Sequence, residues 1–321
     1  MKYCYEEGQK KTGHVFMGEE ITRSARIETL RDTLLEAVPQ ISADRAIIVT
    51  EAYQRYNSET IYIKRAKTLA ELLEKLPITI LDGELIVGSV SDKLRCAHIF
   101  PEFGLDWLIE ELDGNPVRPE KRPGDRYEIA EADENKLREI TDYWRNNNHE
   151  YRCKAVLPEE TRLIREMGVT DSYWLMIGGE GHLTVNLKRI VKEGLSNYMK
   201  RAKERLENLD LSEPSEAFLE SVLITCDAVI KYAGRYAALT EKQAEETENP
   251  VRRKELQHIA DICRRVPAEP ARDFHEALQS IWFINLCIQL ENNGHSISLG
   301  RLDQNLFPYY KEDINSGVMR D

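Results

Sequence analysis

The chain has 321 residues and a mass of 37.1 kDa, and its 44 basic and 56 acidic side chains give a formal net charge of −12. This length corresponds to one large domain or roughly two smaller ones, and either can bury a sizeable core. The acidic balance argues against general nucleic-acid binding, because an anionic surface repels phosphate backbones. No apolar stretch is long enough to span a membrane, and the polar segment 1–20 lacks the apolar region of a secretory signal.

The cysteines are far apart in the sequence and form no CxxC pair, which argues against a zinc ribbon or a thioredoxin-type site. The simplest interpretation is that they are reduced thiols in a cytoplasmic protein. They are Cys4, Cys96, Cys153, Cys226, Cys263 and Cys287.

Helical periodicity dominates the first part of the chain. Apolar residues at helical spacing predict a helix over 27–38, which Pro39 ends. Ser42 is expected to cap a second helix over 46–53. A third helix is predicted over 63–76, with its leucines on one face.

The pattern changes between Leu76 and Gly88, where β-branched residues flank a turn. Two short extended pieces are predicted there, and Leu85–Val87 is expected to be the buried strand. The segment 113–133 is rich in Pro, Gly and charge and is predicted to be a surface loop. Because the helical pattern resumes after it, we place no domain boundary there.

The second half is again helical, with apolar stripes over 187–202 and 218–237. Asn249 and Pro250 are typical of a helix start, and Glu269-Pro270 is expected to begin the last strong helix. Its segment 277–290 is apolar on nearly every side. A helix of this kind is predicted to lie in the middle of a large core.

Two segments, 177–183 and 292–301, interrupt the helical pattern with glycine next to histidine. Glycine allows the backbone to turn sharply and to approach a ligand closely. Imidazole can donate or accept a proton near neutral pH. A pocket is therefore expected where these segments follow the buried helix, with His295 and Ser296 on its floor.

Other interpretations of these segments are open. A histidine after glycine is most often a turn residue with a satisfied side chain, and Asn292-Asn293-Gly294 is typical of a helix stop. A metal site that uses His182 and His295 is a third interpretation, although the sequence fixes no carboxylate near either. No GxSxG, P-loop or dinucleotide-binding glycine pattern occurs.

The run Asn293–Gln304, followed by Leu306–Tyr310, resembles the glycyl radical enzymes of the pyruvate formate-lyase superfamily. Within that family it is most similar to the branch of the B12-independent glycerol and diol dehydratases. Further segments resemble the amino-terminal half of the family in the same order, namely Asp44-Arg45-Ala46 with Thr50-Glu51, Arg65-Ala66, Pro77 to Gly88 and Ile99 to Phe103. The resemblance implies a polar tail over 1–20 and an amino-terminal portion of a PFL-type domain over 21–321.

The resemblance also implies the fold. This chain is expected to be mainly α with a few short strands, as the amino-terminal portion of a ten-stranded α/β barrel wrapped by helices. In the family, one loop carries a cysteine that becomes a thiyl radical and another carries the glycine that stores the radical. The runs that normally hold them, Gly-Cys-Val/Ile-Glu and Arg-Val-Ala-Gly-Tyr, do not occur in these 321 residues. The chain is therefore expected to be inactive by itself.

His182 aligns with the histidine that hydrogen-bonds the departing hydroxyl in the dehydratases and can protonate it. His295 and Ser296 align with residues that hold the hydroxyls of the substrate. The resemblance implies a small-molecule substrate and no permanently bound cofactor. It also implies a glycyl radical installed by a separate S-adenosylmethionine-dependent iron–sulfur activase. The complete protein is expected to be a homodimer in an anaerobic cytoplasm.

Two functional alternatives are open. The chain is either part of a glycyl radical C–O lyase or a non-catalytic helical subunit that completes a split enzyme, whose partner chain carries the cysteine and glycine loops. The run Glu180–Leu183 differs from that of known glycerol dehydratases. The substrate is therefore open as well, and the family also includes formate acetyltransferases and choline trimethylamine-lyases.

Overall fold

The computed structural model describes residues 24–170, 176–178, 181–207 and 210–319. The chain divides into two units, Met1–Ala37 and Val38–Asp321. In the first unit, the described helix is α1 (Ala25–Glu36), and the Ser24 side chain caps it by accepting a hydrogen bond from the Ile27 amide. The helix expected over 27–38 is therefore confirmed, although it ends earlier. The expected tail over 1–20 lies outside the described residues.

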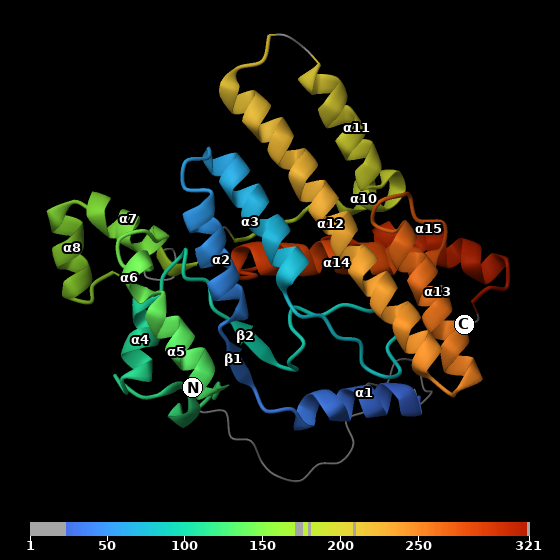
Figure 1. Cartoon of the computed structure of the whole chain (residues 1–321), viewed down its shortest axis with the longest axis horizontal. Coiled ribbons are helices and arrows are strands. Elements are labelled where there is room, and N and C mark those ends of the chain that lie inside the picture. The colour runs from blue at the N-terminus through green and yellow to red at the C-terminus, as the bar shows by residue number, and fades with distance from the viewer. Residues whose placement is uncertain (1–23, 171–175, 179–180, 208–209, 320–321) are drawn as a thin grey trace. The chain divides into compact units, whose positions relative to one another are not determined.

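The second unit is mainly helical (Figure 1), which confirms the predicted structural class. Its described α-helices are α2 (Asp44–Arg55), α3 (Ile61–Lys75), α4 (Asp106–Leu112), α5 (Glu131–Glu139), α6 (Thr141–Trp144), α7 (His149–Val156), α8 (Glu159–Glu166), α10 (Leu187–Glu193), α11 (Leu195–Leu206), α12 (Glu213–Glu246), α13 (Pro250–Arg265), α14 (Phe274–Asn292) and α15 (Leu302–Asn315).

Three short strands form a parallel sheet in the order β2-β1-β3. They are β1 (Gln40–Ser42), β2 (Cys96–His98) and β3 (Glu128–Ile129). Gln40 pairs with Cys96 on one side and with Glu128 on the other. Parallel neighbours need long crossover connections, and α2 and α3 supply the one between β1 and β2. The ten-stranded barrel stays a prediction.

Two local expectations near this sheet are wrong. Ser42 ends β1 instead of capping a helix, and the N-cap of α2 is Ala43. The Ser42 hydroxyl still accepts a hydrogen bond from the Asp44 amide at 3.2 Å. The segment 113–133 is not simply a loop, because it contains a short 3-10 helix, η1 (Pro119–Lys121), and strand β3.

In the second half of the chain, the residue before a helix accounts for the place where that helix begins. The stripe over 187–202 is divided between α10 and α11 at Gly194, which has φ of 73°. Asn249 caps α13 as predicted, accepting hydrogen bonds from two backbone amides. The start expected at Glu269-Pro270 is wrong, because α14 begins at Phe274 and its N-cap is Asp273.

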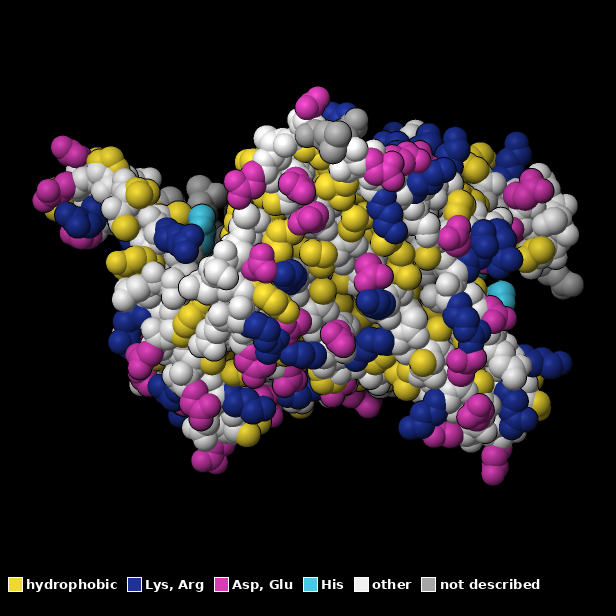
Figure 2. All heavy atoms as spheres, turned by 45° about the horizontal axis from the view of Figure 1, so that its top comes forward, with side chains coloured by type: hydrophobic (Ala, Val, Ile, Leu, Met, Phe, Trp, Pro, Cys, Tyr) yellow, Lys and Arg dark blue, Asp and Glu magenta, His cyan; other side chains and the backbone are white. Residues whose placement is uncertain are grey.

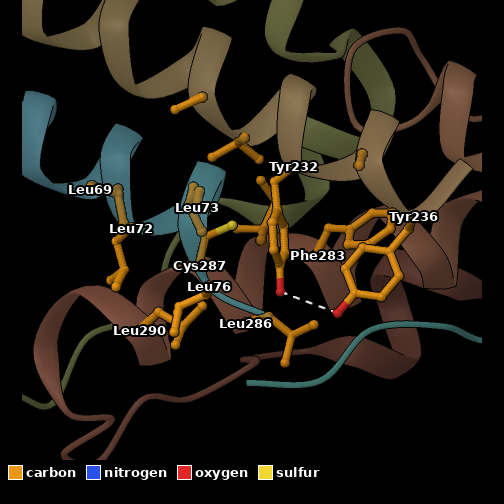
Figure 3. Close-up of a cluster of buried hydrophobic side chains, with 14 of the residues drawn as sticks. Leu69, Leu72, Leu73, Leu76, Tyr232, Tyr236, Phe283, Leu286, Cys287 and Leu290 are labelled. Carbon is orange, nitrogen blue, oxygen red and sulfur yellow. Dashed lines mark hydrogen bonds between the residues drawn. The ribbon is translucent and has the colours of Figure 1, made fainter. Parts of the chain in front are cut away.

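Helix α14 lies in the middle of the hydrophobic core, as its apolar sequence predicts. Figure 3 shows its side chains beside those of α3 and α12. The Tyr232 and Tyr236 hydroxyls of α12 lie 3.3 Å apart in this cluster. The labelled α14 residues are Phe283, Leu286, Cys287 and Leu290. Each is at least nine-tenths buried, so this helix fixes the position of the loop that follows it.

The expected strand Leu85–Val87 is not formed, because side chains take the place of a neighbouring strand. The Gln279 side chain accepts a hydrogen bond from the Val87 amide at 2.9 Å and donates one to its carbonyl at 2.7 Å. Trp282 Nε1 donates to the carbonyl of Gly88 at 2.8 Å. These bonds satisfy the buried backbone without a strand partner.

Hydrophobic side chains also gather at the surface. Figure 2 shows them over the middle of one face, among charged side chains. Ile61, Tyr62 and Phe218 are large hydrophobic residues with exposed side chains, and all three line a cavity of about 530 Å³ between α3, α12 and α14. None of the described helices combines the length and the hydropathy that a bilayer crossing needs.

Candidate active site

The two glycine–histidine segments of the sequence lie side by side. The His182 amide donates a hydrogen bond to the His295 carbonyl at 3.1 Å, and the Ser298 amide donates to the Leu183 carbonyl at 2.9 Å. Thr184 and Ser298 form a parallel β-bridge. Backbone hydrogen bonds therefore join the loop before α10 to the loop after α14.

Gly181 makes this close approach possible. A Cβ at this position would lie 2.7 Å from both Nδ1 and the carbonyl oxygen of His295. Side-chain carbons do not approach other atoms so closely, so a larger residue would push the loops apart. This is the role that the sequence indicated for glycine at a close backbone approach.

Both loops contain residues in the left-handed conformation. Asn293 has φ of 57° and caps α14, which confirms that Asn292-Asn293-Gly294 stops the helix. His182 has φ of 56° and Ser296 has φ of 55°. This conformation is uncommon for residues other than Gly, Asn and Asp. Such strain is often found at functional sites.

The His182 and His295 rings meet in an edge-type contact, with an angle of 62° between their planes and their centroids 5.2 Å apart. His182 and Ser296 are exposed, whereas His295 is half-buried. The two rings are in contact with each other, so both can reach one small polar ligand placed beside the pair, each donating or accepting a proton. The structure thus brings His182 and His295 together and places Ser296 next to His295, on an exposed turn. Their roles stay predictions.

A cavity of about 340 Å³ lies beside His295. This volume is at the lower end of the range for small-molecule sites. Its lining contains no Lys, Arg, Asp or Glu side chain and is partly aromatic, and it consists of His98, Phe100, Gly104, Trp107, Ile177, Gly178, Asn293 and His295. His182 and Ser296 are not in this lining.

His98 is a cavity residue for which the sequence indicated no functional role. Its Nε2 lies 2.6 Å from the Val90 carbonyl oxygen, which can only accept, so Nε2 carries the proton. Burial lowers the pKa of His98, and the charge of Arg45 lowers it further, although the hydrogen bond to Val90 opposes both. The ring is therefore neutral at pH 7. The one sequence feature that could have drawn attention to His98 is its place directly before Ile99 to Phe103, a segment that carries the family resemblance.

Arg45 fixes two walls of this cavity. Its Nε donates to the carbonyl of Leu290, near the end of α14, at 2.8 Å. Its guanidinium lies 3.5 Å above the Phe100 ring and also pairs with Glu102. A single buried side chain thus ties the loop that contains Phe100 to the helix that precedes His295.

Among the described residues, no group of three or more His, Cys, Asp and Glu side chains is arranged to hold a metal ion.

Nearly the whole length of the sequence matches one family model, and this match identifies the family. A sequence model described as pyruvate formate lyase-like matches residues 17–321. The chain belongs to this family. Several individual relatives of the chain are dehydratases, which confirms the resemblance to the glycyl radical dehydratases.

Curated relatives of the chain include proteins that are named as dehydratases. The chain is 33% identical over 298 residues to the probable dehydratase YbiW of Escherichia coli K12, covering 91% of this chain and 36% of the relative. It is 30% identical over 301 residues to (2S)-3-sulfopropanediol dehydratase of Klebsiella oxytoca, covering 92% and 36%. The chain therefore spans about a third of the length of these relatives.

A solved structure has the same fold over the matched part. The glycerol-bound form of the B12-independent glycerol dehydratase from Clostridium butyricum is 37% identical, with a TM-score of 0.88. The match covers 94% of this chain and 38% of that enzyme.

Proposed function

We propose that this chain supplies the amino-terminal part of the active site of a glycyl radical C–O lyase that removes water from a small diol. The observation that carries the proposal is the backbone pairing of the two loops, which holds the His182 and His295 rings 5.2 Å apart. Similarity to a glycerol-bound dehydratase supports the substrate class.

The reaction explains why these residue types are needed. Dehydration of a vicinal diol gives an aldehyde and water, so one C–O bond breaks and a proton must reach the departing oxygen. Hydroxide is a poor leaving group, and a positioned acid accelerates such a step by roughly 10²–10⁴-fold. His182 donates this proton, while His295 and Ser296 hold the hydroxyls of the diol.

The radical chemistry comes from a cysteine and a glycine whose usual runs are not part of these 321 residues. The proposal therefore assigns activity to this chain together with the portion that carries those runs. A separate S-adenosylmethionine-dependent iron–sulfur activase installs the radical, and no cofactor is permanently bound. The complete enzyme is a cytoplasmic homodimer of anaerobic metabolism.

The test uses the native protein, isolated without oxygen in the longest form that the cell makes. After treatment with activase and S-adenosylmethionine, we expect an electron paramagnetic resonance doublet and conversion of glycerol or 1,2-propanediol to an aldehyde. Absence of any radical in the intact, activated protein would refute the proposal. A radical that acts on choline or pyruvate but leaves diols unchanged would refute the diol substrate. A native mass of 37.1 kDa would instead favour the split-subunit alternative.

A further inference from the structure

A second cavity carries an excess of positive charge, although the chain as a whole is acidic. Its volume is about 200 Å³, and it lies between the end of α2, the start of α3, the loop before α4 and the segment from α6 to α7. It shares no lining residue with the cavity beside His295, so a ligand bound here would be separate from one bound there. Its lysine, arginine and carboxylate lining residues are Lys64, Arg65, Glu102 and Arg152.

Two of these four charges are already neutralised by ion pairs. Arg65 pairs with Glu291 of α14. Glu102 pairs with Arg45 at 2.5 Å, and the two side chains are 6% and 2% exposed. Because Arg45 donates to both carboxylate oxygens of Glu102, this carboxylate is not available to a cation in the cavity. The two pairs together add no net charge to the cavity wall.

Lys64 and Arg152 are the charges that remain. Among the residues that the structure describes, no carboxylate forms an ion pair with either side chain. The Lys64 ammonium has neutral partners, since it donates to Asn57 Oδ1 at 3.3 Å and lies 4.6 Å from the centroid of the Tyr53 ring. Burial lowers the pKa of Lys64, and the charge of Arg152 lowers it further. The two cations therefore repel each other, and an anion beside both would offset this repulsion.

Uncharged lining residues supply further hydrogen-bond donors. Burial raises the pKa of Tyr53 to about 12, so its hydroxyl stays protonated near neutral pH. In the described part of the chain, this hydroxyl has no hydrogen-bond partner. The Asn147 amide donates to the Tyr143 carbonyl at 3.2 Å and carries a second N–H. The cavity therefore combines several donors with a single carboxylate that Arg45 already holds, which suits an oxyanion.

We propose that this cavity binds a small phosphate dianion through Lys64 and Arg152. The ligand is free phosphate or the phosphoryl group of a small monoester. Its two negative charges match the two unpaired cations, and the planar guanidinium of Arg152 can donate two parallel hydrogen bonds to it. The cavity is smaller than the ~300 Å³ at which small-molecule sites usually begin, so it encloses little more than the phosphate group itself. The inference does not depend on the proposed function, because the diol is assigned to other residues.

The first test is a calorimetric titration of the 321-residue chain with inorganic phosphate, in a phosphate-free buffer at constant ionic strength and slightly alkaline pH. We expect saturable binding of one phosphate per chain. Glycerol 3-phosphate, used as a competitor, distinguishes the two sources of the ligand. If it displaces phosphate, a monoester is the ligand, and if it does not, free phosphate is. Glycerol, which lacks the charge, should not compete.

Charge-removing substitutions locate the site. K64Q and R152Q should each weaken phosphate binding about tenfold, because each removes one of the two cations beside the ligand. R152K keeps the charge but not the fork of donors, so its loss should be smaller. R145Q is the matched control, because Arg145 is a nearby exposed cation that pairs with Asp142 at 3.2 Å and is not part of the cavity lining. It should leave the affinity unchanged, and thermal melts report whether each variant folds.

Three results would overturn the inference. The first is the absence of saturable phosphate binding. The second is an equal weakening by R145Q, which would show general attraction to a basic surface instead of a site. The third is phosphate binding to the 321-residue chain but not to the native protein in the longest form that the cell makes, since another protein segment would then occupy the cavity. If R152Q does not fold, K64Q still decides, and none of these results bears on the proposed diol site.

Discussion

Arg45 and Glu102 form a buried bidentate ion pair, with Nη2–Oε1 at 2.5 Å and Nη1–Oε2 at 3.1 Å. Their side chains are 2% and 6% exposed. Arg45 also donates to the carbonyls of Ile99 and Leu290. The pair therefore joins α2 to the loop that contains Phe100 and to the end of α14. Because these segments lead to His98 and His295, the ion pair positions the walls of the cavity without being part of its lining.

Removal of one member of this pair should be costly. R45M leaves the Glu102 carboxylate buried without a cation, and we expect a loss of about 3–5 kcal/mol in the free energy of unfolding, measured in urea. The exposed pair Lys231–Asp227 on α12 is the control, and K231M should change stability far less than R45M does, because exposed ion pairs contribute little. Equal effects of the two substitutions would show that the buried pair does not organise the fold.

Gly181 should tolerate no side chain. In G181A the new Cβ would meet His295 at 2.7 Å, and we expect a loss of about 1–3 kcal/mol from the strain of moving the loops. Hydrogen exchange of the His182 amide reports the pairing directly, because this amide donates to the His295 carbonyl. Exchange should be faster in G181A.

Gly234 in α12 provides the matched glycine, since a Cβ there would have no neighbour within 4 Å. G234A should stabilise the chain by about 0.5–1 kcal/mol, because glycine disfavours a helix interior. Unchanged protection of the His182 amide in G181A would contradict the steric role of Gly181.

Periodicity predicted the long helices well because each buries one face over several turns. The predictions for α3, α13 and the apolar part of α14 are confirmed. Strands β1 and β3 are three and two residues long, too short to show any alternation. Leu85–Val87 has the composition of a strand, but its backbone partners are side chains of α14, which is distant in sequence.

The candidate site was predictable only where glycine and histidine are adjacent in sequence. This pattern identified both loops, but it did not predict that backbone hydrogen bonds join them. His98 carries no local pattern, because its place in the cavity lining depends on how segments distant in sequence fold together. The structural role of Arg45 could not be predicted from the sequence either, because its hydrogen-bond partners lie 54 to 246 positions away along the chain.

Glu71 should contribute to stability against acid. Burial by itself would raise the pKa of its carboxyl, but hydrogen bonds from Arg55, Lys75 and Tyr56 lower it to about 2. Because the folded-state pKa is depressed, this stabilisation is complete above the ordinary value of 4.5 and is lost as the pH falls towards about 2. The free-energy difference between the unmodified chain and E71Q should be constant above pH 5 and shrink below it. A difference that does not change with pH would exclude this linkage.

The cysteines should differ in reactivity. Burial raises the pKa of Cys226 to about 11 and that of Cys263 to about 12, so both stay protonated near neutral pH. Cys153 is partly exposed and lies 3.3 Å from His149 Nε2. Since the thiolate is the reactive form, iodoacetamide should label Cys153 well before Cys226 and Cys263. Peptide mass spectrometry during the reaction gives the order, and H149Q tests the contribution of the imidazole. Simultaneous labelling of all three would contradict the burial argument.

The most direct test of the site is His182→Asn in the activated native protein. Asparagine tolerates the left-handed conformation that His182 adopts, so the loop should keep its shape while the proton donor is lost. We expect the radical signal to be unchanged and diol turnover to fall by roughly 10²–10⁴-fold. S296N is the companion variant at the other strained position, and it should raise KM more than it lowers kcat, because Ser296 is assigned to binding. If H182N keeps its turnover and its pH dependence, the proton must reach the leaving hydroxyl from another group, and His182 would then serve only to hold the loop against His295.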